Sequence, residues 1–118
     1  MTNMPLTKYQ HDAMKTAQYP MYRDNLLYPA LKLAGEAGEV AEKVGKLMRD
    51  RGYMPGVDFE LTMEERENLI KEIGDVLWYV AAMADELQYD LQYVAEVNLD
   101  KLQGRLFRGT LRGSGDDR

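Results

Sequence analysis

The chain has 118 residues, a net charge of −5 and no cysteine. The acidic balance argues against a nucleic-acid partner, whose binding surface is usually basic, and the lack of cysteine excludes disulfides and thiolate metal sites. No apolar run approaches the roughly 18 residues that a membrane span needs, and the N-terminus has no signal-peptide pattern, so we expect a single-domain cytoplasmic protein without a membrane partner.

Residues that favour helix are abundant and Val, Ile and Thr are sparse, which predicts an all-α fold. Apolar residues at helical spacing predict a first helix over residues 6–18, which Pro20 ends because the residue before a proline avoids helical geometry. Asp24 and Asn25 are suitable caps and Pro29 is a suitable first-turn residue for a second helix that continues to about Arg49.

A loop rich in glycine and proline follows, and a capping box then opens the third helix. Thr62 and Glu65 have the three-residue spacing of that box, which predicts a helix over residues 63–88. Asp90 is a candidate cap for a fourth helix over residues 91–107. We therefore expect a four-helix bundle.

Residues 1–107 are expected to form one all-α domain, and residues 108–118 a Gly/Arg-rich tail. The tail has no periodicity and allows two interpretations: it wraps onto phosphate groups, or it is an unstructured terminus. The chain has eight tyrosines and one tryptophan, and a bundle this small leaves apolar surface exposed. A second copy of the chain is the common way to cover such a surface, so we expect a homo-oligomer.

Two carboxylate pairs are the most informative feature of the sequence. Glu36 with Glu39, and Glu72 with Asp75, are each three residues apart within a predicted helix. Residues at that spacing share a helix face, so two adjacent helices would bring four carboxylates together. Such a group is a suitable site for a hard divalent cation such as Mg²⁺. The competing interpretation is that acidic pairs arise by chance on solvated helices of a highly charged chain.

Glycines precede acidic residues of both pairs, at Gly35, Gly38 and Gly74. A glycine inside a helix costs roughly 1 kcal/mol relative to alanine, so three of them indicate a need for close approach. We expect Gly35, Gly38 and Gly45 to form a stripe for tight packing of another helix.

The segments GEAGE and EIGD, which contain the four acids, resemble the ExxE…ExxD signature of the MazG-like all-α nucleoside triphosphate pyrophosphohydrolases. The resemblance extends to KYQHDAMKTAQYP, DVLWYVAAMADEL and VNLDKLQGRLFRGTLRGSGDDR, and so covers nearly the whole chain. One departure is the distance between Glu39 and Glu72, which is longer than in compact members of the family. The excess falls in the predicted loop, so the helices should persist.

The resemblance implies that the chain hydrolyses a nucleoside or deoxynucleoside triphosphate between the α and β phosphates, giving a monophosphate and pyrophosphate. It also implies that Glu36, Glu39, Glu72 and Asp75 bind Mg²⁺, with Mn²⁺ as a possible substitute. Glu36 or Glu39 would additionally orient the attacking water. Relatives assemble as dimers or tetramers, which the sequence does not distinguish.

Further candidates would bind the nucleotide itself. Asn98, Lys101 and Arg105 share one face of the fourth predicted helix. The resemblance implies that Asn98 and Lys101 grip phosphate, and Arg105 is added because its guanidinium suits phosphate oxygens. Tyr79, four residues after Asp75, and Gln10, in the first helix, are candidates for contacts with the base.

Two other functions fit an all-α chain. A non-catalytic helical interaction module is the main alternative, because it would keep the bundle without turnover. A di-iron carboxylate bundle is disfavoured, since that class uses Glu-x-x-His motifs and none occurs here. The sequence leaves open the preferred base and sugar, the number of metal ions and the pathway.

Overall fold

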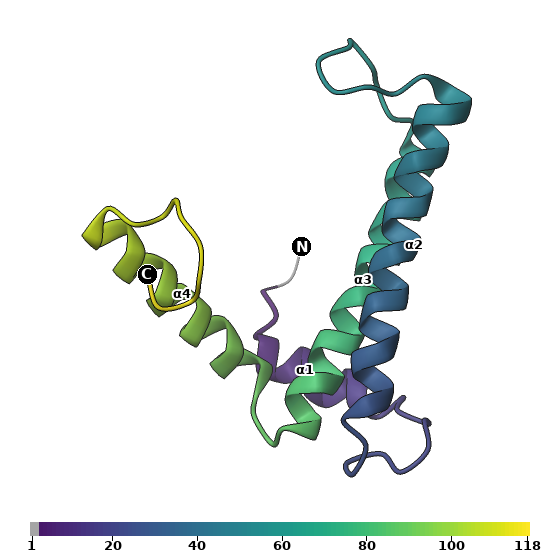
Figure 1. Cartoon of the computed structure of the whole chain (residues 1–118). Helices are drawn as coiled ribbons and strands as arrows, with labels where there is room; N and C mark the ends of the chain where they lie inside the picture. The colour runs from purple at the N-terminus through teal and green to yellow at the C-terminus, as the bar shows by residue number, and fades with distance from the viewer. Residues whose placement is uncertain (1–2) are drawn as a thin grey trace.

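Two long antiparallel helices form the main body of the molecule (Figure 1). They are α2 (Leu27–Arg51) and α3 (Met63–Glu86) in a computed structural model that describes residues 3–118. Apolar residues recur at helical spacing along α2, which gives this helix one face that packs on α3. The predicted all-α fold is confirmed: the described residues form four helices and no strand.

The loop between α2 and α3 is held by local contacts. α2 ends at Gly52, whose φ of +78° is a left-handed conformation that glycine adopts without strain. The capping box is confirmed, because the Thr62 hydroxyl accepts from the Glu65 N–H and the Glu65 carboxylate accepts from the Thr62 N–H. Arg51 joins the two helix ends through an ion pair with Glu65 at 2.7 Å. The residues that lengthen the sequence between Glu39 and Glu72 therefore lie in this loop, and both helices are continuous.

The small core lies at the opposite end of the α2–α3 hairpin. Here α1 (Leu6–Met14) and the start of α4 (Leu91–Arg108) pack against α3. The buried apolar residues of this junction are Met14, Tyr19, Ala81, Ala82 and Leu91. No helix among residues 3–118 combines the length and the apolar character needed to cross a lipid bilayer.

From this junction α4 points away from the hairpin, so the molecule is open (Figure 1). The radius of gyration is 17.4 Å. A compact domain of 118 residues would have a radius of about 13.5 Å. The four helices therefore do not close into a complete bundle within one chain.

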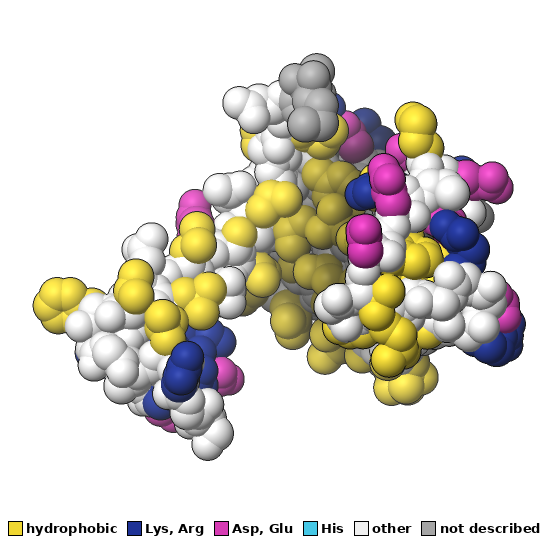
Figure 2. Space-filling view, turned by 90° about the horizontal axis from the view of Figure 1, so that it is seen from above, with side chains coloured by type: hydrophobic (Ala, Val, Ile, Leu, Met, Phe, Trp, Pro, Cys, Tyr) yellow, Lys and Arg dark blue, Asp and Glu magenta, His cyan; other side chains and the backbone are white. Residues whose placement is uncertain are grey.

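Apolar side chains remain exposed on the two arms. Figure 2 shows hydrophobic side chains gathered over the centre of the face in view and along the arm formed by α4. The exposed apolar residues of the two arms include Ile70 and Ile73 of α3 and Val97, Leu102 and Leu106 of α4. Monomeric proteins rarely leave apolar surface of this extent uncovered.

The predicted glycine stripe is not packed within the chain. A Cβ atom added at Gly35, Gly38 or Gly45 would meet no atom within 4 Å, and the same holds for Gly74. The expected close approach of another helix is therefore absent from the single chain.

Helix ends differ from the predicted ones where tertiary contacts compete. α1 stops at Met14 instead of residue 18, because Thr16 Oγ1 and Trp78 Nε1 both donate to the Ala13 carbonyl, at 2.7 and 3.3 Å. α3 stops at Glu86 instead of residue 88, where Gln88 takes a φ of +65°. The predicted cap of the fourth helix is correct in position only, since the Asp90 side chain makes no capping hydrogen bond.

The tail after Arg108 folds back along α4. Gly109, with a φ of +72°, ends the helix and reverses the chain. Arg118 then donates to the carbonyl oxygens of Thr110, Leu111 and Gly115, at 2.7–3.1 Å. We call residues 109–118 the C-terminal hook. The first two residues of the predicted domain 1–107 lie outside the described part of the chain.

Candidate metal and nucleotide site

Three carboxylates from the two long helices meet between α2 and α3. Glu36 and Glu39 of α2 and Glu72 of α3 each offer an oxygen, and these oxygens lie within 4.8 Å of one another. The i, i+3 spacing places the first two on one face of α2, and the antiparallel α3 brings Glu72 to that face. We call these three residues the acidic cluster.

The surroundings of Glu72 within the acidic cluster are compatible with a bound cation. Its Oε2 is buried and has no hydrogen-bond partner among the described residues, while its Oε1 lies 3.5 Å from Lys43 Nζ. Lys43 therefore pairs with one oxygen of the Glu72 carboxylate and leaves the other oxygen unpaired. An unpartnered buried carboxylate oxygen is costly, and a bound cation removes that cost.

Charge repulsion within the acidic cluster is also compatible with a bound cation. The charges of Glu36 and, next, Glu72 raise the pKa of the Glu39 carboxyl. An opposite charge would lower it again, because a neighbouring cation favours the ionised form. The donor set is three carboxylates with an exposed side, which fits a hard cation that keeps some water ligands.

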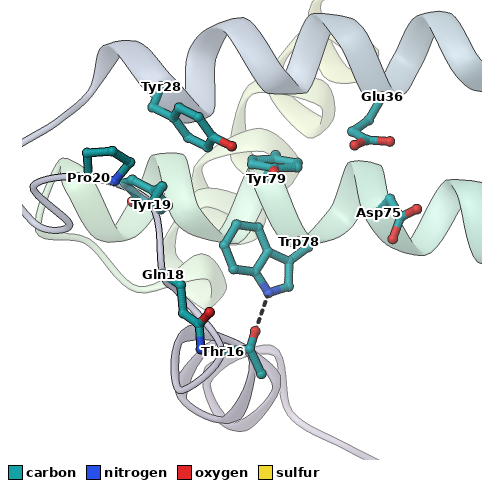
Figure 3. A pocket seen from close by; sticks show the side chains of 9 residues that line it. All are labelled: Thr16, Gln18, Tyr19, Pro20, Tyr28, Glu36, Asp75, Trp78 and Tyr79. Atoms are coloured by element: carbon teal, nitrogen blue, oxygen red, sulfur yellow. Dashed lines mark hydrogen bonds between the residues drawn. The ribbon is translucent and has the colours of Figure 1, made fainter.

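Asp75 lies beside the acidic cluster, in a cleft. This cleft has a volume of about 550 Å³ and is lined by Glu36, Asp75 and aromatic side chains. In Figure 3, Glu36 of α2 and Asp75 of α3 lie across from each other near one end of the cleft. Asp75 is not among the three residues whose oxygens lie within 4.8 Å of one another.

Tyr79 lies in the same cleft as the two acids. Burial, then the neighbouring Tyr28 and the charges of Glu36 and Asp75, raise the pKa of Tyr79 to about 12. Its phenol is therefore neutral at ordinary pH and offers an apolar ring with a hydroxyl group. A nucleobase can stack on such a ring.

Sequence reasoning missed the rest of the aromatic wall. Tyr19 and Tyr28 stack with ring centroids 5.0 Å apart, and Trp78 contacts Tyr79 edge-on at 4.8 Å (Figure 3). Tyr19 comes from the segment after α1 and Tyr28 from the first turn of α2, so no spacing in the sequence links them. Only the high number of tyrosines hinted at such a wall.

The structure does not bring the polar residues of α4 to the acidic cluster within one chain. Asn98 is exposed, and Lys101 lies 3.2 Å from Asp116 of the C-terminal hook. Arg105 is buried and also contacts the hook. These three residues share a face, as predicted, but that face belongs to the arm that points away from α2.

Gln10 is buried and forms hydrogen bonds to the backbone of other segments. It is 6 % exposed, its Nε2 donates to the carbonyls of Ala81 and Tyr89, and its Oε1 accepts from the Leu91 N–H at 2.9 Å. Gln10 thus supplies the cap for α4 that Asp90 does not. Its amide group is occupied by these partners, and the expected contact with the base stays a prediction.

Known proteins resemble this chain over most of its length. The family model for the MazG nucleotide pyrophosphohydrolase domain matches residues 27–107, which contain both acidic pairs. The Gene 37 protein of Mycobacterium phage L5 is 45% identical over 115 residues, covering 93% of this chain and 96% of the phage protein. No solved structure gives a significant match. The match covers most of the chain, including α2, α3 and nearly all of α4, and the chain therefore belongs to the MazG nucleotide pyrophosphohydrolase family.

Proposed function

We propose that the protein is a Mg²⁺-dependent pyrophosphohydrolase that cleaves a nucleoside or deoxynucleoside triphosphate between its α and β phosphates. The observation that carries the proposal is the acidic cluster, whose oxygens lie within 4.8 Å of one another and in which Glu72 Oε2 is buried without a partner among residues 3–118. Water enters at the α phosphorus, the α–β bridging bond breaks, and a monophosphate and pyrophosphate leave. We place the enzyme in the cytoplasm, where its substrate is abundant.

Glu36, Glu39, Glu72 and Asp75 would hold the Mg²⁺, and Mn²⁺ offers the same preference for oxygen ligands. When bound, such an ion neutralises charge on the phosphate oxygens. Glu39, whose carboxylate lies within 4.8 Å of those of Glu36 and Glu72, would also orient the attacking water and accept its proton. Glu36, which lines the cleft, is the alternative candidate for this role.

Tyr79 would stack on the base. The cleft leads from Glu36 and Asp75 along the aromatic wall, so a nucleotide with its phosphates at the acids has its base beside Tyr79. Nothing in this wall distinguishes purines from pyrimidines, so the base preference is left to a substrate panel.

Asn98, Lys101 and Arg105 would grip the phosphates from a second copy of the chain. Within one chain α4 packs on α1 and α3 near the junction and makes no helix contact with α2. A homodimer or homotetramer that covers the open arms would place the α4 of one chain near the acidic cluster of another. The exposed apolar residues of both arms favour such an assembly.

The decisive assay measures pyrophosphate release from a panel of canonical and modified triphosphates, with Mg²⁺, with Mn²⁺ and with EDTA. Glu39→Ala and Asp75→Ala should keep the helical fold and lose activity. The loss should be at least as large as the roughly 10–100-fold that removal of a group merely supporting a metal ligand costs. Glu67→Ala, an exposed acid on α3, is the matched control. If the wild type releases no pyrophosphate with any substrate or metal, the chain is a helical interaction module instead.

A separate experiment tests whether each site combines the acidic cluster of one chain with α4 of another. Glu39→Ala and Lys101→Ala chains, each inactive alone, should regain activity when mixed. In a dimer with random exchange, half the molecules are mixed and each contains one intact site, so recovery should approach about a quarter of the wild-type rate. Absence of recovery, with chain exchange demonstrated, would show that each site is built from one chain.

A further inference from the structure

The C-terminal hook places an acid on the cationic residues of α4. Asp116 Oδ1 lies 3.2 Å from Lys101 Nζ and 3.4 Å from Arg105 Nη2. The carbonyls of Gly115 and Asp116 accept from the same Nη2, at 3.3 and 3.0 Å. Figure 2 shows Lys and Arg side chains beside acidic ones on this arm. The hydrogen bond from Lys101, its charge, and then Arg105 lower the pKa of the Asp116 carboxyl, which is therefore an anion.

The hook fits Arg105 poorly. Three oxygens compete for one nitrogen of the guanidinium, while Arg105 Nε is buried and has no partner within residues 3–118. The Arg105 side chain is only 6% exposed, so water does not relieve that nitrogen. Thr110 Oγ1, near the start of the hook, is also buried and has no partner in the described part of the chain.

We propose that the C-terminal hook is an internal anion that holds the seat formed by Lys101 and Arg105, and that the phosphate groups of the nucleotide displace it. This inference rests on the proposed function, since it identifies the seat with the phosphate grip of α4. A phosphate group offers several oxygens to the guanidinium fork and can satisfy Nε together with Nη, which the single Asp116 oxygen does not.

The contact that competes with substrate is weak enough to be displaced. The ion pair of Asp116 with Lys101 is exposed, since the Asp116 and Lys101 side chains are 84% and 37% exposed, and ion pairs of this kind stabilise proteins little. Asp116→Asn removes the carboxylate charge but keeps the backbone carbonyls that bind Arg105. Asp117→Asn removes the same charge one residue later, and Asp117 forms no ion pair in the described chain. The two variants therefore separate occupation of the seat from a general change in charge.

The experiment uses the full chain, inorganic triphosphate as the probe and EDTA to remove divalent cations, so that binding reports the cationic seat and not the acidic cluster. Calorimetric titration should show that Asp116→Asn binds triphosphate about two- to five-fold more tightly than Asp117→Asn. Because the chain has no cysteine, Ser114→Cys carries a single nitroxide label on the hook. The label should be immobile in the free protein and become mobile when triphosphate is added.

The proposal is overturned if triphosphate does not bind, if the label keeps the same spectrum at saturation, or if the two asparagine variants bind alike. Pyrophosphate release by the wild type with Mg²⁺ is measured in parallel. Turnover combined with any of these results would leave the enzyme assignment intact and reject the hook alone. Displacement of the hook without turnover would support the hook proposal and reject the enzyme assignment.

Discussion

Replacing Gln10 by alanine tests whether this residue holds the junction together or contacts substrate. Gln10 forms three hydrogen bonds, to Ala81, Tyr89 and Leu91, across 71 to 81 residues of sequence. A net contribution of about 0.5–1.5 kcal/mol each gives a total of roughly 3 kcal/mol. Gln10→Ala should therefore strongly destabilise the attachment of α1 to the corner between α3 and α4.

The expected change in melting temperature follows from the size of the chain. About 2.1 cal/mol/K of unfolding entropy per residue gives about 0.25 kcal/mol/K for 118 residues. A loss of roughly 3 kcal/mol then lowers Tm by about 12 °C. Thermal unfolding followed by circular dichroism measures this, with protein concentration held fixed because assembly shifts Tm.

Gln92→Ala, an exposed glutamine on α4, is the control and should change Tm little. A Gln10→Ala chain that melts within about 2 °C of this control would refute the structural role. If that chain also bound nucleotide more weakly, Gln10 would return to the site as a base contact, as the sequence suggested.

Three further predictions concern the metal, the loop and the open glycines. At a hundredfold excess over its Kd, Mg²⁺ should stabilise the wild type by about 2.7 kcal/mol, or about 11 °C in Tm, and Glu72→Gln should lose most of this gain in a thermal scan. The hydrogen bond from Arg51, and then the one from the Thr62 N–H, lower the pKa of Glu65 to about 2, below its unfolded value of 4.5. The stabilisation of the fold by ionised Glu65 is therefore present above pH 4.5 and is lost as the pH falls toward 2. Acid unfolding of Glu65→Gln should lack this pH-dependent loss of stability. The added methyl group of Gly38→Ala meets open space in one chain, so the substitution should raise the helix stability of α2 by up to about 1 kcal/mol. If this face of α2 is an interface, the same methyl group should weaken assembly, which light scattering measures. No change in assembly would show that this face of α2 is free.

The helices could be predicted from sequence because their signals are local. The Thr62–Glu65 box and the apolar periodicity act over a few residues, so the start of α3 was correct to the residue. The meeting of Glu36, Glu39 and Glu72 could be predicted from their spacing and from the pairing of two helices that are adjacent in sequence.

The remaining features depend on contacts between distant residues. Trp78 contacts the end of α1 from 65 residues away, and no residue near Ala13 in the sequence indicates this contact. Gln10 is polar and lies in an amphipathic helix, so its burial became visible only with its partners. The direction of α4 is decided at the junction around Leu91. Helical spacing fixes which residues share a face of α4, but not what that face meets.

The position of Trp78 also gives the molecule a built-in optical probe. It is the single tryptophan of the chain, and its indole lines the cleft that contains Glu36 and Asp75. Excitation selective for indole therefore reports from one place only. A nucleotide settling against the aromatic wall would change the emission of this ring, so ligand titrations need no attached dye and leave every side chain as it is.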